Sequence, residues 1–163
     1  MQSSESTYQQ NRANKPYLKF SWVVVAYFCA VGAALIAIAY MPSQSPLMQA
    51  VVADITATIV IFLFSCMFRN SSFYDPYWSV APPLLMIFWM LSYNVFDPRL
   101  GLILLLTTLW SMRLTHNWAR GWQGLGHIDW RYVDLRAKTG IFFPIVDFLG
   151  IQMFPTVLVF IGC

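Results

Sequence analysis

The chain has 163 residues, of which 58% are hydrophobic and only 10% are charged. Soluble domains carry about a quarter charged residues, so this composition excludes an ordinary soluble domain and favours a membrane protein. The net charge of +3 is modest and is explained by membrane topology, so we expect no nucleic-acid partner. The three cysteines lie far apart in apolar runs, which predicts packed, unreactive thiols and no disulfide framework.

Residues 1–19 are polar and are expected to form a disordered cytoplasmic tail. Five apolar stretches follow, and a helix needs about 20 residues to cross the hydrocarbon layer of a membrane. We therefore predict an all-α fold, a multi-span transmembrane bundle that forms one membrane domain over residues 20–163. The expected spans cover residues 20–40, 50–68, 82–96, 100–119 and 145–163, with a cytoplasmic loop over 120–144.

The basic residues predict the orientation of this bundle. If the N-terminus is cytoplasmic, nine of the ten Lys and Arg residues lie on the cytoplasmic side and only Arg99 lies opposite. The membrane would be the cytoplasmic membrane of a bacterium or the endoplasmic reticulum of a eukaryote. The last apolar run ends at Cys163 without interfacial anchors, so we expect that a C-terminal half is missing.

A polar face is predicted at the cytoplasmic end of the fourth span. This span must continue to about Ala119, because its uncharged part alone is too short to cross the membrane. Four polar side chains then share one face of the helix, namely Arg113, His116, Asn117 and Arg120. Such a face is expected to point into the bundle or a water-filled cavity. Alternatively, the side chains extend outward to the lipid headgroups.

A short helix is predicted after the fourth span. Asp129 is placed to cap a helix from Trp130 to about Lys138, which Gly140 would close. Tyr132 and Arg136 are four residues apart and share a face of that helix. Asp129 is either a cap or a ligand, and one residue can perform both roles.

Other motifs are few. The sequence contains no nucleotide-binding glycine motif, no zinc motif and no nucleophilic-serine motif, so we expect no metal. The only glutamate is Glu5, so acid–base chemistry would have to use Asp, His or Tyr. Asp54 lies about one turn inside the second span, which indicates a functional carboxylate or an interfacial residue near the helix N-terminus.

Four segments between about Arg69 and Gly140 carry a resemblance to a known family. They are Asp75-Pro76-Tyr77-Trp78-Ser79, Trp110-Ser111-Met112-Arg113-Leu114, Asn117-Trp118-Ala119-Arg120-Gly121-Trp122 and Asp129-Trp130-Arg131-Tyr132-Val133-Asp134-Leu135-Arg136. In this order the segments resemble uncharacterised membrane proteins related to steroid 5α-reductases, whose superfamily includes sterol C14-reductases and small membrane methyltransferases. The chain departs from that pattern at His116, where an aromatic residue is common, and at Ile128, where a glutamate is common. Nothing after Gly140 resembles the family's C-terminal half.

The resemblance implies an NADPH-dependent reduction of a conjugated C=C bond in a lipid or steroid-like substrate. Carried over residue by residue, it implies that the cofactor is bound by Arg113, Asn117, Arg120, Asp129, Arg131 and Arg136. It also implies that Tyr77 and Tyr132 are catalytic, and that Asp75, Trp78 and His116 border the substrate cavity.

Two alternatives to a reductase are open. The chain could be a relative of the membrane methyltransferases that use S-adenosylmethionine, although such a site needs no clamp for a 2′-phosphate and the several arginines favour NADPH. It could also be a non-catalytic membrane protein, either a truncated product or a scaffold subunit.

Overall fold

The computed structural model describes residues 16–126 and 128–163, and all regular structure among them is helical. Four long helices come first, and their bounds are α2 (Pro16–Ala39), α3 (Pro46–Phe68), α4 (Tyr77–Ser92) and α5 (Pro98–Gly121). A last helical run joins α7 (Phe143–Val146), the π-helix η3 (Asp147–Met153) and α8 (Phe154–Gly162). The shorter elements are the 3-10 turns η1 (Ser71–Phe73) and η2 (Gly140–Phe142) and the helix α6 (Trp130–Thr139).

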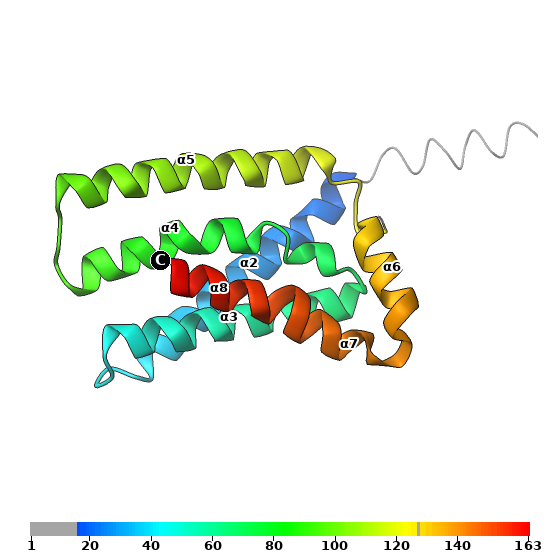
Figure 1. The fold of residues 1–163 in the computed structure, drawn as a ribbon, viewed down its shortest axis with the longest axis horizontal. Helices are drawn as coiled ribbons and strands as arrows, with labels where there is room; N and C mark the ends of the chain where they lie inside the picture. Colours follow the sequence, from blue (N-terminus) through cyan, green and yellow to red (C-terminus); the bar gives the residue numbers. More distant parts are fainter. Residues whose placement is uncertain (1–15, 127) are drawn as a thin grey trace, which may run out of the picture.

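The long helices form a bundle of alternating direction, and α6 lies across one end of it (Figure 1). That end also holds the start of α2, the α3–α4 loop and the end of α5. Helix α2 packs along α3, α4 packs along α5, and α8 contacts both α3 and α4. The predicted all-α bundle is therefore confirmed.

Three helical stretches of the described chain are long and apolar enough to cross a membrane. They are Phe20–Ala39, Pro46–Phe68 and Trp130–Gly162, which indicates an integral membrane protein. The predicted third and fourth spans form helices of 16 and 24 residues, and their crossing of the membrane stays a prediction, as does the cytoplasmic N-terminus. The extension of the fourth span to about Ala119 agrees with the observed end of α5 at Gly121.

Two predicted boundaries are corrected. Helix α2 begins at Pro16, so residues 16–19 belong to a helix and not to a tail, while residues 1–15 lie outside the described residues. Helix α4 begins at Tyr77, and Pro82 and Pro83 lie inside it rather than at its start. Proline has no N–H. Pro82 and Pro83 therefore leave carbonyls in the first turn of α4 without the donor that a helix normally supplies.

Small side chains allow close packing at the centre of the bundle. Ala26 and Ala30 of α2 are buried against Ala57 and Ile61 of α3, which lets the two helix backbones approach each other. The three cysteines are free and exposed, so the prediction of packed thiols is wrong: the alanines, and not the cysteines, occupy the inward positions.

A left-handed turn ends α3 and directs the chain into the loop that carries the site. Arg69 has φ of 51°, its N–H donates to the Cys66 carbonyl at 3.2 Å, and the Asn70 N–H donates to the Ser65 carbonyl at 2.9 Å. This pair of bonds is a Schellman motif, in which glycine is the usual left-handed residue.

We predict that Arg69→Gly raises the free energy of unfolding by about 1 kcal/mol, because glycine adopts the left-handed conformation without the steric cost of a Cβ. Thermal unfolding in detergent would measure this as a higher melting temperature. Arg69→Ala is the matched control, since it removes the same side chain and keeps the Cβ. Equal melting temperatures for the two variants would contradict the prediction.

Candidate functional site

The α3–α4 loop is buried although it is polar. The Asn70 side chain is only 1% exposed. Its oxygen accepts from the Ser72 N–H at 3.0 Å, and its amide donates to the Leu125 carbonyl at 3.1 Å. Asn70 therefore joins this loop to the α5–α6 loop. The sequence analysis did not identify it, because its partner lies 55 residues away.

Aromatic packing fixes the next part of the loop. Phe73 is fully buried, and its carbonyl accepts from the Tyr27 hydroxyl at 3.1 Å. Its ring lies 5.3 Å from the ring of Phe68 and 6.2 Å, edge to face, from that of Trp122. Residues from α2, α3 and the α5–α6 loop thus hold the segment that leads to Asp75.

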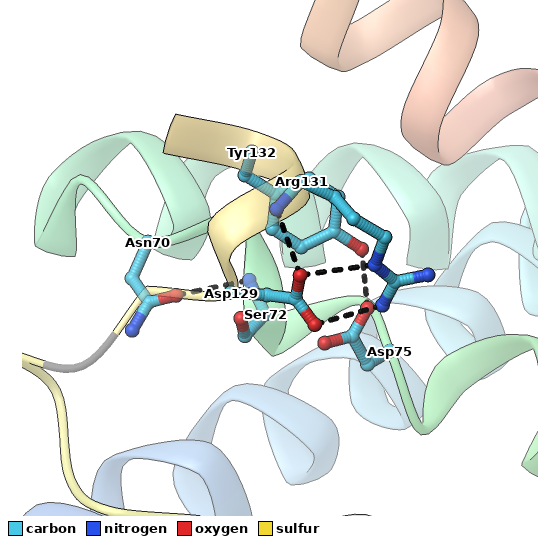
Figure 2. Close-up of polar contacts among 6 residues, drawn as sticks. All are labelled: Asn70, Ser72, Asp75, Asp129, Arg131 and Tyr132. Carbon is cyan, nitrogen blue, oxygen red and sulfur yellow. Dashed lines mark hydrogen bonds and ion pairs between the residues drawn. The ribbon is translucent and has the colours of Figure 1, made fainter. Parts of the chain in front are cut away.

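Asp75 receives a hydrogen bond from α6. The Tyr132 hydroxyl donates to Oδ1 of Asp75 (Figure 2). Burial raises the pKa of the Asp75 carboxyl to about 6, although the hydrogen bond from Tyr132, the nearby Arg131 and a hydrogen bond with Ser72 oppose the rise. A carboxyl with such a pKa is partly protonated near neutral pH, so the Asp75–Tyr132 pair can both accept and donate a proton.

Asp129 is the N-cap of α6 and also an ion-pair partner. Its carboxylate accepts from the Arg131 N–H at 2.9 Å, as a cap does. The Arg131 guanidinium donates to both carboxylate oxygens, from Nε and Nη2 at 2.9 Å each. The Arg131 side chain is still 59% exposed, so the rest of its guanidinium can meet a ligand anion.

These side chains line a cavity of about 540 Å³, here called the α6 cavity. Its wall is formed by the α3–α4 loop, α4, the end of α5, the start of α6 and the η3–α8 run. Five of its lining residues are aromatic, namely Tyr74, Trp78, Trp118, Trp122 and Tyr132. The polar ones include Asp75, Asn117, Asp129 and Arg131. The buried Trp122 Nε1–H has no hydrogen-bond partner among the described residues, so it can donate to a ligand.

Six of the predicted site residues meet at the α6 cavity. They are Asp75, Trp78, Asn117, Asp129, Arg131 and Tyr132. Asp129 caps α6, as predicted, and also lines the cavity, while its role as a ligand stays a prediction.

The predicted polar face of α5 is corrected. Asn117 lines the cavity, whereas Arg113, His116 and Arg120 are exposed and are not among its lining residues. The indoles set the rotation of the helix, because Trp118 packs against Phe20 of α2, with 6.0 Å between ring centres, and Trp122 packs against Phe73. The cofactor and substrate roles of the three exposed residues stay predictions.

Arg136 and Tyr77 also lie away from the α6 cavity. The Arg136 guanidinium lies 4.4 Å from the ring centre of Phe143 and borders a separate cavity of about 370 Å³. Tyr77 was expected beside Trp78, but its hydroxyl instead donates to Oδ1 of Asp54 at 2.6 Å. Asp54 is only 6% exposed. The structure therefore shows a buried carboxyl and not an interfacial residue.

The residues that line the α6 cavity fall within the part of the chain that a protein-family model matches. A family model described as "Protein of unknown function (DUF1295)" matches residues 61–163. The chain belongs to this family. The DUF1295 match extends on both sides of the range from about Arg69 to Gly140 that the resemblance was expected to cover.

A distant relative is found among curated proteins. An uncharacterised protein of Schizosaccharomyces pombe is 34% identical over 91 residues, which is 53% of this chain and 26% of that protein. The match therefore spans about a quarter of the relative's length. No solved structure matches the chain.

We predict that the protein becomes less stable as pH rises through about 6, because of Asp75. Its unfolded carboxyl loses its proton near the ordinary pKa of 3.8, while the folded one keeps it to about 6. The folded state therefore binds more protons between these values, and this contribution to stability is lost as pH rises. Melting temperatures in detergent at pH 5 and pH 7 would show a drop that Asp75→Asn reduces. Asp134→Asn, at an exposed ion pair with Lys138, should leave the drop unchanged.

We also predict that Asn70→Ala lowers the free energy of unfolding by about 2 kcal/mol, since it leaves the part-buried Leu125 carbonyl and the buried Ser72 N–H without their partner. Chemical unfolding in detergent would measure the loss. Asn117→Ala, at an exposed position of α5, is the control. A loss for Asn70→Ala no larger than for the control would contradict the role of Asn70 as a link between the loops.

Proposed function

We propose that this chain belongs with the steroid 5α-reductase relatives and that it binds NADPH in the α6 cavity to reduce a conjugated C=C bond of a lipid or steroid-like substrate. The observation that carries the proposal is the hydrogen bond from the Tyr132 hydroxyl to the carboxyl of Asp75 on the wall of this cavity. The four segments that resemble the reductase relatives supply eleven of the lining residues, and the apolar helices supply a membrane setting for a lipid.

The residues of the cavity fit such a cofactor. Three tryptophans offer flat apolar walls for a ring, and Trp122 Nε1 is a buried donor without a partner. The Arg131 guanidinium is held by Asp129 yet exposed, so it can pair with a phosphate oxygen. Asn117 adds an amide at the same opening.

In the proposed reaction, bound NADPH supplies a hydride for the β-carbon of an enone. Negative charge then develops on the carbonyl oxygen, and a donor placed at that oxygen stabilises it. The Tyr132 hydroxyl is the donor, and Asp75, with a pKa of about 6, can return a proton to Tyr132. The enolate oxygen would take the Tyr132 proton, and the enol would become the ketone when its α-carbon gains a proton and its hydroxyl releases one. In total, one hydride and one proton add across the C=C bond.

The first test is cofactor binding to detergent-purified protein, followed by quenching of tryptophan fluorescence. We expect saturable binding of NADPH that is tighter than that of NADH or S-adenosylmethionine. Arg131→Ala should weaken NADPH binding about ten-fold, the effect of losing one charge-assisted contact. Lys138→Ala, at an exposed ion pair, is the control. Equal binding by Arg131→Ala would contradict the site, and a preference for S-adenosylmethionine would favour the methyltransferase alternative.

The second test separates chemistry from binding. Tyr132→Phe should lower the rate of enone reduction by about 100-fold or more, because it removes the proton donor, while the Kd for NADPH stays the same. The rate of NADPH oxidation in the presence of lipid enones would measure this decrease. Tyr93→Phe, at an exposed position, is the matched control, and an active Tyr132→Phe protein would exclude Tyr132 as the donor.

A further inference from the structure

A second open space lies on the other side of the Tyr74–Tyr77 wall. It is a groove of about 310 Å³ between α2, α3 and α4, here called the membrane groove. Aliphatic side chains form almost all of its lining, and Asp54 and Tyr77 are its notable polar groups. The rings of Tyr74 and Tyr77 lie 5.3 Å apart, with Tyr74 lining the α6 cavity and Tyr77 lining the groove.

Asp54 has one carboxyl oxygen committed and one free. Oδ1 accepts from Tyr77 at 2.6 Å, whereas the buried Oδ2 has no hydrogen-bond partner among the described residues. A buried polar atom without a partner is costly. A protonated Asp54 carboxyl, with its proton on Oδ2, would suit this position better than a carboxylate.

A file of hydroxyl groups connects Asp54 to the α6 cavity. The Thr58 and Tyr77 hydroxyls both donate to the Asp54 carbonyl, at 2.9 and 3.1 Å, so they lie next to each other. Thr58 Oγ1 also lies 3.0 Å from that of Thr156. The Thr156 hydroxyl in turn lies 2.8 Å from the Tyr74 hydroxyl. The two threonines and Tyr74 are buried, at 3% exposure or less. The π-helix η3 precedes α8 directly, and the wider turn of a π-helix contributes to placing Thr156 opposite Thr58.

We propose that this file of Tyr77, Thr58, Thr156 and Tyr74 is a proton path, which lets the Asp54 carboxyl in the membrane groove exchange its proton with the α6 cavity. The inference goes beyond the proposed reduction, because it concerns proton exchange alone and holds whether or not a cofactor binds.

The transfer conserves atoms and charge at each step. A hydroxyl is both donor and acceptor, so each oxygen takes a proton from one neighbour as it gives its own to the next. The net result is one proton moved, with every hydroxyl restored. At rest Thr58 donates to the Asp54 carbonyl at 2.9 Å and Thr156 to the Gln152 carbonyl at 2.9 Å. Transfer therefore requires the Asp54 carboxyl to turn its protonated oxygen toward Tyr77, and the Tyr77 and threonine hydroxyls to turn from their present acceptors toward the next oxygen of the file.

The surroundings of Asp54 favour this route. The titratable groups that interact with it electrostatically are Tyr74, Tyr77 and Cys163. Two of these three belong to the file. Cys163 follows the last residue of α8, whereas Thr156 lies near the start of that helix. A Cys163 variant therefore tests whether protons reach Asp54 from that end of α8 instead.

The test is the rate at which the Asp54 carboxylic acid exchanges its proton for deuterium. Infrared difference spectra against Asp54→Asn identify its C=O band in the full chain in detergent, and transfer into D₂O shifts this band. We expect Thr58→Val, Thr156→Val and Tyr74→Phe each to slow the exchange at least ten-fold. Thr58→Ser, which keeps the hydroxyl, should exchange at the wild-type rate.

Thr108→Val is the matched control, because Thr108 also donates to a carbonyl four residues back, that of Leu104 at 2.7 Å, and lies outside the file. Its exchange rate and that of Cys163→Ala should equal the wild-type rate. Unchanged exchange in the three file variants, slower exchange in Cys163→Ala, or the absence of an Asp54 carboxylic-acid band at pH 7 would each overturn the proposal. None of these readouts depends on cofactor binding, so failure here is distinct from failure of the proposed reductase function.

Discussion

The burial of the short loop between α3 and α4 is the constraint on which the rest of the structure depends. A polar loop at the end of an apolar bundle must satisfy its backbone groups within the protein. Asn70 does so by bonding Ser72 and the Leu125 carbonyl, and Tyr27 does so by bonding the Phe73 carbonyl. These contacts join α2, the α3–α4 loop and the α5–α6 loop into one unit, which gives both open spaces a common wall.

From this loop and the first residue of α4, the chain directs three neighbouring side chains to different places. Asp75 points to α6, where the Tyr132 hydroxyl meets it (Figure 2). Tyr74 reaches Thr156 of α8, and Tyr77 reaches Asp54 of α3. A single segment thereby sets the positions of the Asp75–Tyr132 pair at one end of the bundle and of the Asp54 carboxyl within it. This shared support explains why the two spaces lie back to back rather than in separate parts of the molecule.

The two proposals assign different work to these spaces. The α6 cavity has aromatic walls, an exposed arginine held by Asp129 and the Asp75–Tyr132 pair, which suit a polar cofactor and proton donation. The membrane groove is almost wholly apolar around Asp54, which suits a lipid-facing role. The hydroxyl file between them contains neutral groups only, so it can move a proton without placing a lasting charge in the apolar interior.

The sequence by itself determined the helical class, the membrane character and the short capped helix after the fourth span. Those features depend on local properties: apolar length, helix-capping residues such as Asp129 and Gly140, and sparse charge. Through a resemblance, the sequence also predicted a shared site for six residues that line the α6 cavity. Only the tertiary structure decided the rotation of α5, the burial of Asn70, and the position of the Tyr77 side chain. That side chain contacts Asp54, while its neighbour Trp78 lines the α6 cavity. Each of these depends on a partner distant in sequence, such as Leu125 for Asn70, and helical periodicity alone does not specify which partner packs where.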